Sequence, residues 1–141
     1  MIAALTRGVL PLVPAKLIQS DGARYLAGSS LEEGIETIRE HHQRGIYSSL
    51  DILGEAAENV EQANEYVNSY IQALTKINRV LPGTGNRHTS PVSVSVKLSS
   101  ICVVYPFDDD FLTDSHTRLQ PQLEKIVNVA QSYNIPVTID M

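Results

Sequence analysis

Asp51, Lys97 and Asp140 each end a short segment rich in Val, Ile and Ser, and together these three side chains could form a polar active-site rim. An ammonium group can bind a substrate carboxylate, or, as a neutral amine, form an imine with a carbonyl compound. Two flanking carboxylates favour the protonated ammonium, which weakens the imine interpretation. The alternative is an ordinary lysine at a strand end with its ammonium in water.

The three segments are predicted strands at about residues 46–51, 92–97 and 137–140. Successive residues of a strand face opposite sides, so each segment has one aliphatic and one polar face. The polar faces hold Tyr47, Ser49 and Asp51, then Ser93, Ser95 and Lys97, then Thr138 and Asp140. In a parallel sheet, functional groups collect at the carboxyl ends of the strands.

Helices are predicted between these strands, which favours an α/β fold with parallel strands. A helix at about 31–44 begins at the capping box Ser30–Glu33 and ends at Gly45. An amphipathic helix from Val60 should end before Pro82, and a third helix, at about 119–130, tolerates Pro121 only in its first turn. Asn134 and Pro136 should close off this third helix.

The length of 141 residues is too short for a closed eight-unit barrel, which takes about 250 residues. The segment at 137–140 lies at the end of the sequence, although a strand needs a neighbour for its backbone groups. We therefore expect a partial (β/α)8 TIM-type barrel with about three parallel strands. Residues 1–141 would form a single incomplete domain, with an N-terminal cap segment at 1–23.

The net charge of −5 and the scattered 11 basic residues give no electrostatic footprint for nucleic acid. Cys102 is the single cysteine, so an internal disulfide is excluded and a buried thiol in a reducing compartment is expected. The apolar opening segment is interrupted by Pro11 and Pro14 and is too short for a membrane span. A cytoplasmic protein is the expectation.

Other polar clusters favour structural roles, and no metal site is expected. Asp108–Asp110 lack the alternating spacing of a calcium loop, and His41 and His42 are adjacent on one predicted helix. His88 lies in a loop at the opposite end of the predicted sheet. Glu55 follows Gly54 at a helix start, where it could complement the helix dipole or form an ion pair over the site.

Several strings, in this order, resemble the proline dehydrogenase family. They are RYLAG at 24–28, LEEGI at 31–35, SLDILGEA at 49–56, VSVKLSS at 94–100 and VTIDM at 137–141. Each is weak alone, but their order and strand contexts are specific. The resemblance implies a distorted (β/α)8 barrel that binds FAD and oxidises L-proline to 1-pyrroline-5-carboxylate, the first step of proline catabolism. A membrane quinone would accept the electrons, with peripheral association at the inner membrane.

The resemblance also implies roles for individual residues. Lys97 matches the family lysine near the substrate carboxylate and flavin, and Asp140 matches the aspartate of the third strand, so both are candidate catalytic and cofactor-binding residues. Glu55 matches the gating glutamate, and Asp51 belongs to the same motif. The family's later strands, which hold most of the FAD, and its final arginine-bearing helix have no counterpart here. We expect this chain alone to be inactive and to need a complementing C-terminal half.

Two alternatives remain open at this stage. The first is a Schiff-base lyase or aldolase barrel that uses Lys97 as the imine-forming amine. The second is a non-catalytic remnant that pairs its open sheet edge with another chain, because an unpaired edge strand favours such association.

Overall fold

The computed structural model describes residues 27–28, 30–54, 56–82, 90–103 and 111–140, and side chains in the last range from residue 117 onward. In this part of the chain the elements are α3 (Leu31–Gln43), β1 (Ser48–Asp51), α4 (Val60–Val80), β2 (Val92–Lys97), α5 (Leu98–Ile101), α6 (Phe111–Ser132) and β3 (Val137–Asp140). The chain divides into two compact units, Met1–Thr37 and Ile38–Met141, and the second contains every described strand. The predicted cap segment 1–23 lies outside the described residues.

Helix α3 agrees with the predicted helix at 31–44 to within one residue. At its start, the backbone N–H of Glu33 donates to Ser30 Oγ at 3.2 Å, which is one half of the predicted capping box. At its end, Gly45 has a φ of 71°, and the N–H of Ile46 donates to the carbonyl of His41 at 2.9 Å. This left-handed cap satisfies the last carbonyls of the helix, as the glycine predicts.

Strand β1 begins at Ser48, two residues later than predicted. The N–H of Ile46 is already used by the cap of α3, so Ile46 and Tyr47 form the connection and not the strand. The prediction that Tyr47 shares a strand face with Ser49 and Asp51 is therefore wrong, and its side chain is 71% exposed. At the start of β1, Ser48 Oγ lies 3.0 Å from His41 Nδ1, which ties the strand to the preceding helix.

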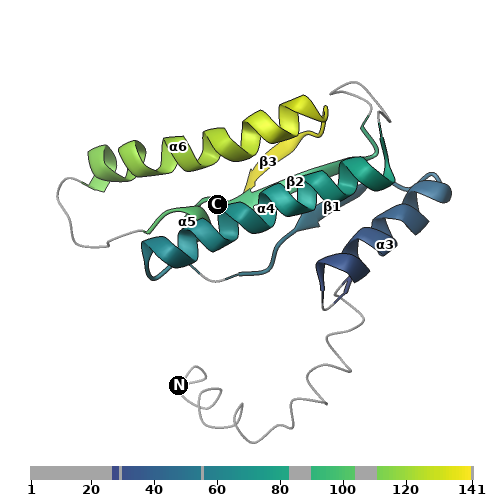
Figure 1. Cartoon of the computed structure of the whole chain (residues 1–141), viewed down its shortest axis with the longest axis horizontal. Helices are drawn as coiled ribbons and strands as arrows, with labels where there is room; N and C mark the ends of the chain where they lie inside the picture. Colours follow the sequence, from purple (N-terminus) through teal and green to yellow (C-terminus); the bar gives the residue numbers. More distant parts are fainter. Residues whose placement is uncertain (1–26, 29, 55, 83–89, 104–110, 141) are drawn as a thin grey trace, which may run out of the picture. The chain divides into compact units, whose positions relative to one another are not determined.

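The three strands form one parallel sheet in the order β1-β2-β3, so β2 has a neighbour on each side. Helices α4 and α6 run side by side across one face of this sheet (Figure 1). The core lies between helices and sheet, and the side chains that share it are almost fully buried. They include Leu74 and Ile77 of α4, Val94 and Val96 of β2, and Ile126 of α6. This is the predicted α/β arrangement of parallel strands with helices on one face.

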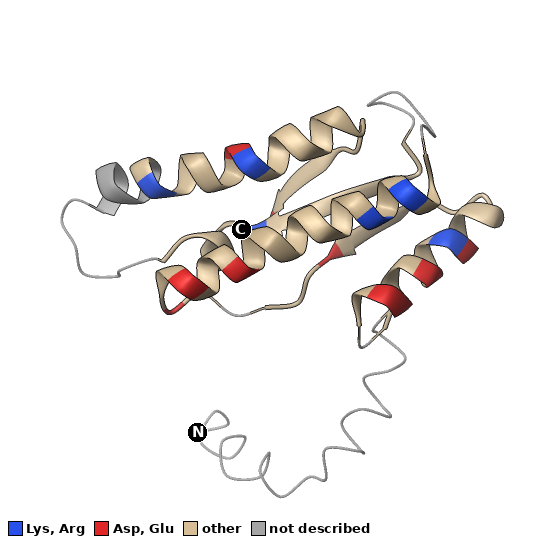
Figure 2. Ribbon diagram, viewed as in Figure 1, with Lys and Arg blue, Asp and Glu red and all other residues tan. Residues whose placement is uncertain are grey.

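Helix α4 extends from Val60 to Val80 and ends before Pro82, as predicted. Its N-cap is Asn59, whose side-chain oxygen accepts the N–H of Gln62 at 2.8 Å. Negative charges lie near its start and positive charges near its end, which complements the helix dipole (Figure 2). Val60 departs from the predicted apolar stripe, because as the first helical residue it is 51% exposed.

Helix α6 begins at Phe111, eight residues before the predicted start at 119, and contains Pro121 in its interior. A proline costs a helix one backbone hydrogen bond, about 3 kcal/mol in all. The exposed Pro121 is accommodated because the buried side chains of Ile126 and Ala130 fix the following turns against the core. Asn134, at a φ of 56°, then ends the helix, as predicted, and the N–H of Ile135 donates to the carbonyl of Ala130.

Two further observations concern the length of the helices and the thiol. None of the helices in the described ranges has the length and apolarity that crossing a bilayer requires. Cys102 is a buried thiol, as predicted, with 5% of its surface exposed and no disulfide.

Candidate functional site

Strand β2 separates an apolar face from a polar face with strict alternation. Val92, Val94 and Val96 are at most 2% exposed, whereas Ser93, Ser95 and Lys97 are half-buried on the opposite face. The alternation predicted for this strand is therefore confirmed. The valines lie under the helices, so the serines and the lysine occupy the face that α4 and α6 leave open.

The sheet register brings the charged strand ends to one edge. Lys97 is the register partner of Asp140, and Asp51 is the partner of Ser95, two residues before the lysine. Both carboxylates are exposed. Because all three strands are parallel, Asp51, Lys97 and Asp140 all lie at the carboxyl end of the sheet, where parallel α/β folds place their ligands.

The ammonium of Lys97 makes a contact that the sequence did not predict. Its Nζ donates to the carbonyl oxygen of Gly54 at 3.3 Å. Among the described residues, no ion pair joins Lys97 to Asp51 or Asp140, so the predicted direct pairing is not formed. The carbonyl lies in the connection that follows β1, so the end of β2 is hydrogen-bonded to that connection.

Gly54 allows this connection to lie close to helix α4. A Cβ atom at this position would overlap the ring of Tyr66, so only glycine fits without movement of the ring. A second bond fixes the same connection, because the N–H of Ala57 donates to the carbonyl of Ser99 at 2.8 Å. The loop after β1 is therefore attached to the residues that follow β2. Glu55, the predicted gate residue, lies outside the described residues.

A short helix, α5, begins directly after Lys97. Its residue Ser100 is 1% exposed, and its hydroxyl donates to the carbonyl of Lys97 at 2.8 Å. On the other side, the backbone N–H of Lys97 donates to the hydroxyl of Tyr70 at 3.2 Å. Sequence reasoning assigned Tyr70 no role at this site; the available signal was its hydroxyl, which needs a partner when it is buried.

Comparison with known proteins decides the family. A family model described as proline dehydrogenase matches residues 34–141. The chain belongs to the proline dehydrogenase family.

Relatives named proline dehydrogenase or bifunctional protein PutA match much of the chain. The chain is 30% identical over 120 residues to "Bifunctional protein PutA" of Klebsiella aerogenes, covering 84% of this chain and 9% of that protein. It is 28% identical over 118 residues to "Proline dehydrogenase 1" of Bacillus subtilis subsp. natto, covering 84% of this chain and 33% of that protein. The chain thus spans at most about a third of these proline dehydrogenase relatives.

A solved structure of the same family shares the fold. The chain superposes with a TM-score of 0.69 and 22% identity on proline utilization A from Bdellovibrio bacteriovorus inactivated by N-propargylglycine. The match covers 82% of this chain and 13% of that one. The three parallel strands and their helices are therefore a part of a TIM-like barrel, as predicted. In such a barrel the polar face of the sheet looks into the interior and the helices lie outside.

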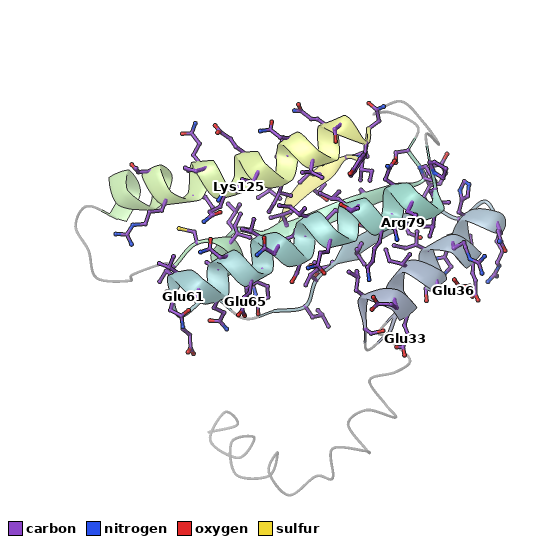
Figure 3. The ribbon with its side chains drawn as sticks, viewed as in Figure 1. Glu33, Glu36, Glu61, Glu65, Arg79 and Lys125 are labelled. Carbon is purple, nitrogen blue, oxygen red and sulfur yellow. The ribbon has the colours of Figure 1, made fainter. Side chains whose placement is uncertain are left out.

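The charged side chains that Figure 3 labels belong to helices and not to the strands of the sheet. Figure 3 shows Glu61 and Glu65 near the start of α4, Arg79 near its end, and Lys125 on α6. Lys97 is therefore the cation that the described strands contribute to the open face. No group of three or more His, Cys, Asp or Glu in the described part of the chain is placed to hold a metal ion. Asp108–Asp110 and His88 lie outside that part.

Proposed function

We propose that this chain is the N-terminal portion of a barrel that oxidises L-proline to 1-pyrroline-5-carboxylate with FAD as cofactor. The carrying observation is the position of Lys97 on the open polar face, at the carboxyl end of the central strand, in a chain of the proline dehydrogenase family. The whole of residues 1–141 would belong to one incomplete domain that the remaining strands of the barrel complete.

The hydrogen-bond donors on the polar face of the sheet are suited to a part of proline and a part of FAD. An ammonium and hydroxyl groups can hold the carboxylate of proline or hydrogen-bond the polar edge of a flavin ring. Lys97 supplies the ammonium, and Ser93, Ser95 and Thr138 lie on the same polar face. Lys97 is the one cationic side chain in the described strands. The diphosphate of FAD therefore needs further donors that these strands do not supply. Little FAD affinity is expected for the chain alone.

In the reaction, a hydride leaves the ring carbon of proline that is bonded to nitrogen and does not carry the carboxylate. The nitrogen loses a proton, and a C=N bond forms between these two atoms. Bound FAD supplies the oxidant that accepts the hydride. Lys97 would orient the substrate through its carboxylate, and the exposed carboxylate of Asp140, its register partner, would face the same ligands. Asp51 and Glu55 would belong to the rim that closes over proline. A membrane quinone would then reoxidise the flavin, with peripheral contact between a cytoplasmic enzyme and the membrane.

A chimera tests the proposal. Residues 34–141 replace the matching segment of Proline dehydrogenase 1 from Bacillus subtilis, and proline-dependent reduction of a dye is measured. We expect turnover by the chimera, and a loss of about 100-fold or more in kcat/KM with Lys97→Met, because a positioning charge is removed. Lys125→Met, which removes the same charge from an exposed face of α6, is the matched control and should keep most of the activity. A folded, flavin-loaded chimera without turnover would refute the proposal.

The same preparations separate this function from the imine-forming alternative. Borohydride traps an imine between Lys97 and a carbonyl substrate as a stable adduct, whereas a flavoenzyme shows a yellow chromophore and no adduct. The contact between Lys97 and Gly54 favours the flavoenzyme interpretation. The Gly54 carbonyl accepts a hydrogen bond from Nζ and cannot take a proton from it, so it does not help the amine to attack a carbonyl carbon. Turnover of proline by the isolated chain would contradict our expectation that it is inactive alone.

A further inference from the structure

Two buried hydroxyl groups hold the backbone of Lys97 from opposite sides. Tyr70 Oη accepts the N–H of Lys97 at 3.2 Å, and Ser100 Oγ donates to its carbonyl oxygen at 2.8 Å. Tyr70 is 0% exposed and Ser100 is 1% exposed. Neither residue contributes a charge or lies on the polar face of the sheet, so neither has a role in the proposed reaction so far.

The hydroxyl of Tyr70 accepts the hydrogen bond that the Lys97 N–H would otherwise make to a neighbouring strand. Strand β1 ends at Asp51, which is the register partner of Ser95, so the ladder between β1 and β2 stops before it reaches Lys97, which is paired only with Asp140 of β3. A buried N–H without an acceptor destabilises the folded state, so this amide needs another partner. The hydroxyl of Tyr70, on α4, accepts the bond from this amide. A phenylalanine would fill the same space in the core and leave the amide without that acceptor.

The serine acts at the next peptide group. Lys97 has extended backbone angles, φ −86° and ψ 115°, and the short helix α5 begins at Leu98. Strand geometry therefore changes to helix geometry immediately after the lysine. Because Ser100 fixes its carbonyl and Tyr70 fixes its N–H, both peptide groups next to the Lys97 Cα are held. The direction of the Cα–Cβ bond, and with it the path of the side chain to Gly54, follows from these two contacts.

We propose that Tyr70 and Ser100 are positioning residues, which aim the ammonium of Lys97 across the open face toward Gly54 and the substrate carboxylate. The part that concerns substrate rests on the function proposed above. The part that concerns the aim of the lysine does not, because it follows from the hydrogen bonds of the polypeptide itself.

The backbone contact is tested by amide hydrogen exchange in the ¹⁵N-labelled 141-residue chain. Tyr70→Phe should raise the exchange rate of the Lys97 amide by about 5- to 10-fold, the effect of one lost hydrogen bond. The Val94 amide, which donates to the Pro136 carbonyl in the adjacent ladder, is the internal reference and should keep its rate. Tyr133→Phe removes a hydroxyl beyond the end of α6 and is the matched control.

The aim of the side chain is tested by acylation with acetic anhydride, mapped by mass spectrometry. Release of Nζ from the Gly54 carbonyl should raise the acylation rate of Lys97 by about fivefold in Tyr70→Phe, relative to Lys125. Lys125 donates to Gln122 on an exposed helix face and reports general loosening. Ser100→Ala should act in the same direction, so the result does not depend on one variant.

The results of these two measurements test the positioning role separately from the proposed function. Faster exchange of the Lys97 amide with an unchanged acylation ratio would overturn the positioning role and leave Tyr70 a support of the backbone alone. Equal acceleration of Lys97, Lys125 and the Val94 amide would also overturn it, because it indicates general destabilisation. Neither measurement uses proline or flavin, so an inactive chimera would refute the proposed function without changing these results.

Discussion

The two faces of the sheet share one backbone but differ in the polarity and the burial of their side chains. On the face covered by α4 and α6, three valines of β2 are at most 2% exposed. On the other face, serines alternate with them and a lysine ends the strand. One strand of six residues therefore contributes to the core and to the candidate site. The covered face should govern stability, and the open face should tolerate change except at its carboxyl end.

The largest change in stability is expected when a charge is placed on each face in turn. Val94→Asp puts a carboxylate at a position that is 0% exposed, which should cost at least about 4 kcal/mol and leave the chain largely unfolded. Ser93→Asp, one residue earlier on the open face, should cost at most about 1 kcal/mol. Urea unfolding followed by circular dichroism measures both. Similar losses for the two variants would show that the faces are equally covered.

A smaller effect is expected where the open face meets the covered one. Gly54→Ala should destabilise the chain by about 1–3 kcal/mol, because the new methyl group overlaps the ring of Tyr66. The double variant Gly54→Ala/Tyr66→Ala should recover at least about 1 kcal/mol relative to the sum of the single changes. Additive losses in thermal or urea unfolding would exclude the close approach between these two residues.

The smallest effect concerns a hydrogen bond that lies wholly on the open face. Ser93 Oγ donates to Ser49 Oγ at 3.1 Å, and the bond is exposed to water. Ser93→Ala should change the free energy of unfolding by no more than about 0.5 kcal/mol, since water replaces the lost partner. Val92→Ala, its neighbour on the covered face, is the control and should cost about 1–3 kcal/mol. A loss above 1 kcal/mol for the serine variant would contradict an open face.

The alternating pattern of β2 was readable from the sequence because side-chain parity in a strand leaves one solution when valines and serines alternate. The cap residues Gly45 and Asn134 were equally readable, since both adopt the positive φ that ends a helix. The family resemblance, carried by short strings around Asp51, Lys97 and Asp140, was confirmed by the family match to residues 34–141.

Contacts between distant segments could not be predicted in the same way. No local pattern states that the Lys97 ammonium reaches the Gly54 carbonyl and not a neighbouring carboxylate. The partner of the Tyr70 hydroxyl depends on where β1 ends, because the pairing of β1 with β2 stops at Asp51 and Ser95, before Lys97. The early start of α6 was missed because the prediction took Pro121 as a boundary. The roles assigned to Glu55, Asp51, Lys97 and Asp140 stay predictions.

The buried thiol at the end of α5 provides a reporter that requires no substitution. Cys102 follows Ile101 directly and is the only cysteine in the sequence, so an alkylating reagent has one target. Its modification requires the segment after β2 to separate transiently from the core. The alkylation rate of the native chain would therefore measure how often the strand end that carries the lysine opens, and ligands that bind there should slow the reaction.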